Sequence, residues 1–293
     1  MLEEVISYLR VEPGKTYIDC TVGGGGHSEA ILEKSSPDGF LFGLDRDQSA
    51  LDQADERLKE RFQGRYHFYH SDFRSFKQMI DPEKKGKVHG ILADLGVSSM
   101  QLGNPERGFS FQATGPLDMR MDRSQQESAG DLVRTLPERE LARIIETYGE
   151  ERYAGRIARA IVRERETDPI LTTAHLADLI KRSVPPVYRY GRIHPATRTF
   201  QAFRIAVNRE LESLSEFIQE TYPFLEKGGR LAVISFHSLE DRIVKRTFLS
   251  LVQKIKKDPL FQWTKRPLCP TEAEIRENPA SRSAKLRVIE RRA

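Results

Sequence analysis

The fold is decided by one stretch of this 293-residue chain, Thr16-Tyr17-Ile18-Asp19-Cys20-Thr21-Val22-Gly23-Gly24-Gly25-Gly26-His27-Ser28. Residues 16–22 are mostly apolar or β-branched and predict a buried strand that ends at the four glycines. Residues 27–34 follow with the apolar spacing of a helix. Glycine has no Cβ, so a strand–glycine–helix turn lets a ligand approach the backbone closely. The turn is therefore the first candidate for a binding site.

On both sides of this turn the chain alternates strand-like and helix-like segments. Apolar runs predict strands at 40–44, 66–69, 88–95 and 230–235, and residues 49–62 have helical spacing. Alternating strands and helices predict a parallel sheet covered on both faces. Between about 128 and 184 only helix signals occur. We therefore expect an α/β fold in which a discontinuous sheet domain (1–108 and 209–293) carries an inserted helical domain (109–208).

Composition excludes several classes of protein. The net charge is +4, 38% of the residues are hydrophobic and 31% are charged, which favours a well-solvated globular protein. The two cysteines, Cys20 and Cys269, form no metal-ligand pattern, so a disulfide framework or a zinc site is not expected. No apolar run is long enough for a membrane span, and the N-terminus has no signal-peptide pattern. A cytoplasmic location is the expectation.

An acidic residue strengthens the ligand interpretation of the turn. Asp45 closes the second predicted strand, where a carboxylate can accept hydrogen bonds from both hydroxyls of a ribose. The dinucleotide fingerprint is not met, since its last glycine falls on Ser28 or Glu29, and no P-loop sequence follows. These departures favour S-adenosylmethionine over a pyrophosphate ligand. The alternatives are a tight turn without a ligand and an Asp45 that only caps the next helix.

A second signal lies between Lys181 and Arg209, where no aspartate or glutamate occurs. Basic residues can neutralise phosphates, and interleaved aromatic rings can stack on unpaired bases. The stretch predicts a nucleic-acid contact, for which Arg198 and Arg204 are the substrate-binding candidates. The alternative is a solvated charged face. The basic and aromatic residues concerned are Lys181, Arg182, Tyr188, Arg189, Tyr190, Arg192, Arg198, Phe200, Phe203, Arg204 and Arg209.

Five longer motifs occur along the chain: the glycine turn (19–28), residues 94–99 with 107–111 and 115–122, residues 194–205, residues 235–242 and residues 278–283. They resemble the motifs of one known family, the bacterial 16S ribosomal RNA (cytosine-N4) methyltransferases, also called the MraW or RsmH family. The resemblance covers nearly the whole chain. One departure is the start, Met1-Leu2-Glu3-Glu4-Val5, which falls inside a region where the family usually has a His-x-Pro-Val segment; a truncated N-terminus is one interpretation.

The resemblance implies a Rossmann-like class I methyltransferase that uses S-adenosylmethionine to methylate the N4 amine of a cytosine in the decoding region. The implied partner is the small ribosomal subunit, and neither a metal nor a membrane is implied. Phe73 would lie near the adenine, although packing in the core is an equal alternative. The cofactor contacts implied by motif are Gly26, His27, Ser28, Asp45, Phe73, Asp94 and Gln101.

The acceptor nitrogen shares its lone pair with the cytosine ring, so hydrogen-bond acceptors aimed at its protons would assist the reaction. Asp94 and Asp118 are the catalytic candidates. Asp94 could instead serve only the cofactor, and Asp118 could only anchor the insertion through an arginine. A structural role is favoured for His237. Three other functions stay open: a methyltransferase for another RNA, a protein or a small molecule; a nicotinamide-dependent oxidoreductase; and a non-catalytic RNA-binding assembly factor.

Overall fold

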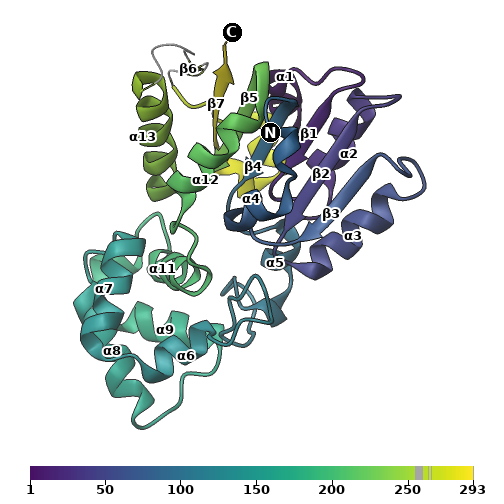
Figure 1. The fold of residues 1–293 in the computed structure, drawn as a ribbon. Coiled ribbons are helices and arrows are strands. Elements are labelled where there is room, and N and C mark those ends of the chain that lie inside the picture. Colours follow the sequence, from purple (N-terminus) through teal and green to yellow (C-terminus); the bar gives the residue numbers. More distant parts are fainter. Residues whose placement is uncertain (255–259, 263, 265, 293) are drawn as a thin grey trace. The chain divides into compact units, whose positions relative to one another are not determined.

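The computed structural model describes residues 1–254, 260–262, 264 and 266–292. The chain forms two compact units, one of Met1–Gly96 with Leu211–Ala293 and one of Val97–Glu210 (Figure 1). We call them the sheet unit and the helical unit. Within the described residues, no helix is both long and apolar enough to cross a membrane.

The sheet unit contains one seven-stranded sheet in the order β3-β2-β1-β4-β5-β7-β6. The first five strands of this order are parallel, and β7 pairs antiparallel with both β5 and β6. Parallel neighbours place their carboxyl ends at one edge, where ligands of open α/β sheets bind. The strands are β1 Thr16–Asp19, β2 Phe40–Asp45, β3 Tyr66–His70, β4 Val88–Asp94, β5 Leu225–Ser235, β6 Leu260–Gln262 and β7 Lys285–Arg291.

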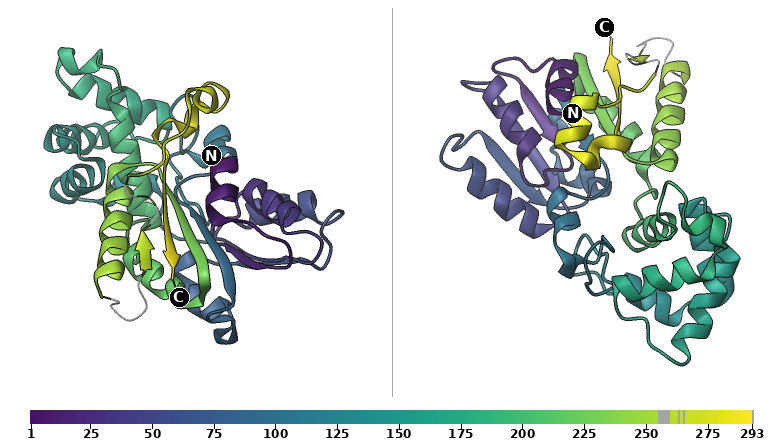
Figure 2. Two further views of the ribbon diagram at one scale, coloured as in Figure 1. Left: turned by 90° about the horizontal axis from the view of Figure 1, so that it is seen from above. Right: turned by 180° about the vertical axis from the view of Figure 1, so that it is seen from behind.

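Helices cover both faces of this sheet, as the view from above shows (Figure 2). Helices α1, α2 and α3 pack on one face, and α4, α12 and α13 pack on the other. Successive side chains of a strand point to opposite faces, so Tyr17 of β1 packs in the core under α1, α2 and α3, and Ile18 packs in the core under α4, α12 and α13. The helices are α1 Leu2–Leu9, α2 Gly26–Lys34, α3 Gln48–Leu58, α4 Phe76–Met79, α12 Leu214–Thr221, α13 Ser238–Lys254 and α14 Glu272–Glu277, with short 3-10 turns η1 Phe73–Ser75, η2 Pro82–Lys84, η4 Tyr222–Phe224 and η5 Pro279–Ser283.

The helical unit has a hydrophobic core of its own. Helices α6 and α9 begin at capping side chains: the Ser128 side chain accepts from the Asp131 N–H at 3.2 Å, and the Thr172 side chain accepts from the His175 N–H at 3.2 Å. The helices are α5 Ser99–Gly103, α6 Ala129–Thr135, α7 Glu138–Gly149, α8 Ala154–Arg165, α9 Thr173–Ser183, α10 Pro186–Arg189 and α11 Ala196–Asn208, with the 3-10 turn η3 Pro105–Arg107.

The architecture confirms the predicted fold class, a Rossmann-like α/β sheet with an inserted helical domain. Single strands differ at their ends. The first strand was expected to run to Val22, but β1 ends at Asp19, although the Cys20 and Val22 N–H groups still donate to the Leu92 and Leu44 carbonyls at 2.8 and 3.1 Å. The fifth strand begins at Leu225, five residues before the apolar run that predicted it.

Candidate active site

The glycine turn joins β1 to α2 with backbone angles that favour glycine. Gly23 has φ 51° and Gly25 has φ 80°, both in the left-handed region. A Cβ on Gly25 would also come within 3.0 Å of the Ala54 Cβ. Beside Gly26, a Cβ would meet no atom within 4 Å in the described part of the chain. The turn therefore leaves open space at the first residue of α2.

Asp45, at the carboxyl end of β2, is held against this turn. One of its carboxylate oxygens accepts from the Gly23 N–H at 2.8 Å, and the other accepts from the Asp47 N–H at 2.9 Å. Burial raises the pKa of Asp45, and these two hydrogen bonds oppose that rise. Each carboxylate oxygen can accept a second hydrogen bond. The orientation of the carboxylate is thus fixed while its capacity to accept from a ligand is kept.

A buried acid, Asp19, ends β1 and was not among the predicted site residues. Asp19 is fully buried and accepts from the Ser28 hydroxyl at 2.8 Å and from the Thr21 N–H at 3.1 Å. Burial raises its pKa to about 6. Ser28, a predicted cofactor residue, is itself fully buried and fixes this carboxylate. The signal that could have found Asp19 is a charged residue closing an otherwise apolar strand.

Asp94, at the end of β4, has the most unusual environment in the sheet unit. Its Oδ1 is buried and has no hydrogen-bond partner among the described residues. Its Oδ2 lies 3.6 Å from the His27 Nδ1, and its own N–H donates to the Thr21 hydroxyl at 2.6 Å. Burial, followed by the charge of Asp19, raises the pKa of Asp94 to about 7. Burial lowers the pKa of His27 to about 4, so His27 is a neutral neighbour at pH 7.

These groups fit a ligand that is both a ribose derivative and a cation. Buried acids with raised pKa values gain stability when a positive charge approaches them. An unpaired buried carboxylate oxygen is costly unless a ligand satisfies it. S-adenosylmethionine has ribose hydroxyls for Asp45 and cationic groups for Asp94. The residues at this edge of the sheet can therefore hold that cofactor.

Phe73, the predicted adenine neighbour, is 7% exposed and packs in the core of the sheet unit. Its ring centroid lies 4.9 Å from that of Phe217 on α12. The Arg46 guanidinium lies 5.7 Å from the centre of the Phe73 ring. The acid before Phe73 is also engaged, because Asp72 accepts from Arg46 at 2.6 Å and from Arg74 at 2.9 Å. Phe73 thus has a structural role, and an adenine contact would be additional.

The other predicted residues lie in the helical unit. Gln101 closes a capping box with Ser98 at the start of α5. Asp118 receives two hydrogen bonds from Arg120, at 2.7 and 2.9 Å. Burial opposes ionisation of Asp118, but the bonds from Arg120 outweigh it and lower the pKa. In the sheet unit, the His237 Nε2 lies 3.2 Å from the Glu240 carboxylate.

The two arginines predicted to bind RNA have internal partners. Arg198 donates to the Glu150 carbonyl at 3.2 Å. Arg204 forms a two-pronged ion pair with Glu210, with both distances 2.9 Å. The Glu210 side chain is only 6% exposed, so Arg204 compensates a buried charge. Phosphate binding by Arg204 would compete with this pair.

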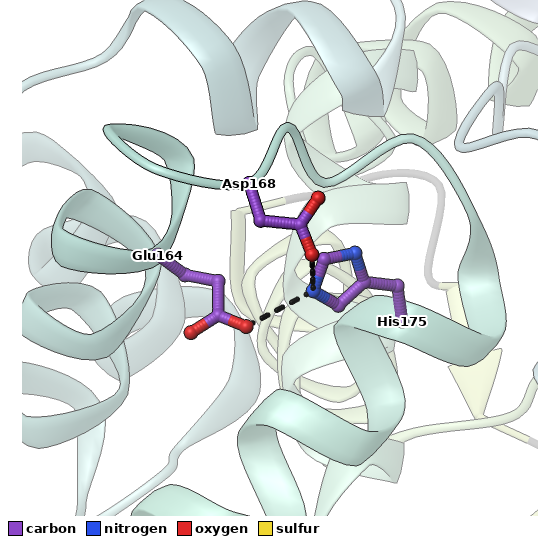
Figure 3. A group of neighbouring side chains, drawn as sticks. All are labelled: Glu164, Asp168 and His175. Atoms are coloured by element: carbon purple, nitrogen blue, oxygen red, sulfur yellow. Dashed lines mark hydrogen bonds and ion pairs between the residues drawn. The ribbon is translucent and has the colours of Figure 1, made fainter.

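Three side chains in the helical unit have the chemistry of metal ligands (Figure 3). His175 Nε2 lies 3.1 Å from Glu164 and 3.8 Å from Asp168. The same Glu164 oxygen, however, also pairs with Arg182 at 3.2 Å, and Asp168 is 69% exposed. Because an arginine already compensates Glu164, we describe this group as an ion-pair network.

Comparison with known proteins decides the family. The model of the MraW methylase family matches residues 1–292. The chain belongs to the MraW methylase family. Curated members from Citrifermentans bemidjiense and Syntrophotalea carbinolica are 50% and 49% identical over 99% of this chain and 96% of their own lengths. A member from Clostridioides difficile is 45% identical over 99% of this chain and 97% of its own length. All three are named ribosomal RNA small subunit methyltransferase H.

For a member of this family, the cofactor is S-adenosylmethionine, and the carboxyl edge of the sheet offers the groups it needs. The family match does not assign roles to single residues.

Proposed function

We propose that this MraW-family protein transfers a methyl group from S-adenosylmethionine to the N4 amine of a cytosine in the decoding region of small-subunit ribosomal RNA. The observation that carries the proposal is the carboxyl edge of the sheet, where the fixed carboxylate of Asp45 and the unsatisfied oxygen of Asp94 suit a cationic ribose derivative. The names of the relatives support the choice of RNA. A reaction of this kind takes place in the cytoplasm, where ribosomes are assembled.

The proposed cofactor contacts are residues of the glycine turn, the strand-end acids Asp45 and Asp94, and Phe73 and Gln101. Gly26 and His27 border the open space at the start of α2, and Ser28 positions Asp19. Asp45 is the ribose acceptor, and Asp94 faces the positively charged part of the molecule. Gln101 and Phe73 are weaker assignments, because each already has a structural partner. When bound, the cofactor supplies a methyl group activated by its sulfonium charge.

The chain's own contribution to the reaction is positioning and hydrogen bonding. A cytosine N4 nitrogen becomes a better nucleophile when acceptors bind its two protons and its lone pair leaves the plane of the ring. Asp94 and Asp118 are the proposed acceptors. In the free protein burial raises the pKa of Asp94 to about 7, and its ionised carboxylate in the complex can accept the proton that the methylated amine releases. Alignment of two reactants contributes roughly 7–11 kcal/mol in well-oriented systems.

We assign the helical unit to RNA recognition, because the acid-free stretch from Lys181 to Arg209 lies in it. The target base must leave its stack to meet a buried donor. Arg198 and Arg204 remain the proposed phosphate contacts. No step of this proposal needs a metal ion.

The experiment that tests the function is mass spectrometry of nucleosides from small-subunit RNA, with and without the gene for this protein. The proposal expects one N4-methylated cytidine to disappear with the gene and to return with the intact gene. Purified protein should restore it on isolated small subunits. An unchanged nucleoside profile, together with methylation of a protein or small molecule, would replace RNA as the substrate.

A further inference from the structure

The acid-free stretch from Lys181 to Arg209 contains four aromatic residues, and the structure separates one of them from the rest. Phe200 and Phe203 are 4% and 0% exposed and belong to the core of the helical unit. The Tyr188 hydroxyl donates to Glu151 at 2.5 Å. Tyr190 is 82% exposed and makes no ring contact with another described residue. Only Tyr190 among these four has a face available to a ligand.

Residues 187–193, which we call the α10–α11 tip, are firmly attached on both sides. Before Tyr190, the Tyr188 ring contacts the Tyr153 ring with centroids 5.0 Å apart. The Arg189 Nε donates to the Val184 carbonyl at 2.9 Å. After the tip, the His194 ring lies 4.8 Å from the Phe111 ring at an interplanar angle of 33°. The ring of Tyr190 is therefore displayed on an anchored segment.

The tip also exposes apolar surface to water. Val187 is 91% exposed and Ile193 is 56% exposed, beside the 82% of Tyr190. Exposed apolar side chains that gather in one segment indicate a binding surface more often than scattered ones do. Covering them with a flat apolar partner would be favourable. The tip is therefore a candidate contact surface.

The positive charges around the tip indicate a negatively charged partner. Among the described residues, Lys181 and Arg192 form no ion pair, and Arg189 donates only to backbone carbonyls. Lys181 is close enough to His194 to lower its pKa, in addition to the effect of burial. An exposed ring among uncompensated cations fits a chain of phosphates with accessible bases. A purely apolar protein surface would leave these cations without partners.

We propose that the α10–α11 tip binds a single-stranded RNA segment, with an unpaired nucleobase stacked on Tyr190 and the neighbouring phosphates bound by Arg192 and Lys181. The inference rests on the proposed RNA substrate and adds a binding site outside the cofactor edge. Stacking on an aromatic ring tolerates any base, because every base has a π-face. The site therefore holds a single strand and does not select its sequence.

Binding of fluorescein-labelled RNA to the full-length protein tests the inference. Tyr190→Ala should weaken binding of a single-stranded RNA about tenfold, whereas a duplex of the same sequence should bind as before. Tyr190→Phe keeps the ring and should bind like the parent. Leu171→Ala, which removes another exposed apolar side chain (69% exposed) of the helical unit, is the matched control and should have no effect. Arg192→Ala should reduce the slope of log K against log salt by about one.

A photo-crosslink gives a readout that a general loss of stability cannot produce. RNA with 5-iodouridine at single positions should crosslink to Tyr190, as located by peptide mass spectrometry. If Tyr190→Ala binds single strands like the parent and no crosslink reaches the tip, the inference is wrong while the proposed function stands. If the parent protein neither binds nor methylates RNA, both are wrong.

Two further outcomes would assign the tip to another partner. Loss of binding to anionic lipid vesicles in Tyr190→Ala, with RNA binding unchanged, would indicate a membrane surface. Loss of binding to assembled small subunits alone, with protein-free RNA bound normally, would indicate a ribosomal protein. Either result overturns the inference.

Discussion

Two sets of acids in this protein have opposite environments. In the sheet unit, Asp19 is fully buried and the Asp94 side chain is 27% exposed, with its Oδ1 buried and without a hydrogen-bond partner among the described residues. Loss of solvent raises the pKa of Asp19 to about 6 and that of Asp94 to about 7. In the helical unit, Asp118 is held by two hydrogen bonds from Arg120, and its pKa is lowered. An aspartate carboxylate thus has an oxygen without a hydrogen-bond partner in the sheet unit (Asp94), whereas in the helical unit an arginine compensates its charge (Asp118).

This difference in compensation distinguishes acids that can bind a cationic ligand from acids that stabilise the fold. An unsatisfied buried carboxylate lowers the stability of the free protein and becomes favourable only when a cation arrives. A compensated carboxylate gains nothing further from a ligand unless its arginine moves. The sheet unit is therefore the place where cofactor binding should be most sensitive to substitution, and the four predictions below test this contrast.

Substitution of Asp45 should have the largest effect. Asp45→Ala removes the acceptor of both ribose hydroxyls, and each hydrogen bond to a charged group is worth about 1.5–3 kcal/mol. We expect affinity for S-adenosylmethionine to fall at least about 100-fold in isothermal titration calorimetry. Asp52→Asn, on the surface of α3, is a matched control and should bind like the parent. Unchanged affinity in Asp45→Ala would remove this acid from the site.

Asp118→Ala distinguishes catalysis from anchoring in the helical unit. If Asp118 accepts a proton of the target amine, methyl transfer should fall about 100-fold while calorimetry gives an unchanged cofactor affinity. Arg120→Ala is the comparison, because Arg120 also donates to the Gln125 carbonyl at 2.6 Å and its loss tests the anchor alone. Equal losses in both variants would make Asp118 a positioning residue. Full activity in Asp118→Ala would exclude both roles.

The pH dependence of cofactor binding should report the raised pKa of Asp94. The ionised carboxylate is the form that attracts a cation, so affinity should be constant above about pH 7 and fall as the pH decreases through that value. Below this point the free protein must release a proton to bind, which costs about tenfold in affinity per pH unit. Asp94→Asn should give a weaker but flatter profile between pH 5.5 and 8.5. A parent profile without this decrease would contradict an ionised Asp94 in the complex.

The smallest effects on ligand binding are expected for the two arginines of the helical unit. Arg198→Ala should weaken RNA binding several-fold and reduce the salt slope by about one, with little change in stability. Arg204→Ala leaves the buried Glu210 without its charge partner, so the variant should also lose about 3–5 kcal/mol of stability in chemical denaturation. If the two variants are equally stable, the pair with Glu210 is not structural.

Much of the fold was predictable because its signals are local. The runs that predicted β1, β2 and β4 are short and apolar and end at glycine or aspartate, and the structure places a strand at each of them and at the predicted β3. The antiparallel β7 was harder to foresee. Its sequence, Lys-Leu-Arg-Val-Ile-Glu-Arg, includes charged residues, two of which are buried because Arg287 pairs with Asp241 and Glu290 pairs with Arg230. Such pairings join residues far apart in the sequence, and no local pattern reveals them.

The sequence allowed several residues of the candidate site to be named. It did not reveal their burial or their hydrogen-bond partners. Gly26 and Asp45 could be named because a glycine turn and a strand-ending acid are local features. The unpaired oxygen of Asp94 and the burial of Asp19 depend on how β1 and β4 pair, which only the structure gives. The distinction between the buried Phe200 and the exposed Tyr190 likewise required the three-dimensional packing of the helical unit.

A crystal structure of the full protein with S-adenosylhomocysteine tests the central claim most directly. We predict that both ribose hydroxyls donate to the Asp45 carboxylate and that the amino group of the ligand lies within hydrogen-bond distance of Asp94 Oδ1. A structure in which the ligand binds away from the glycine turn, with Asp94 Oδ1 still lacking a partner, would contradict the account.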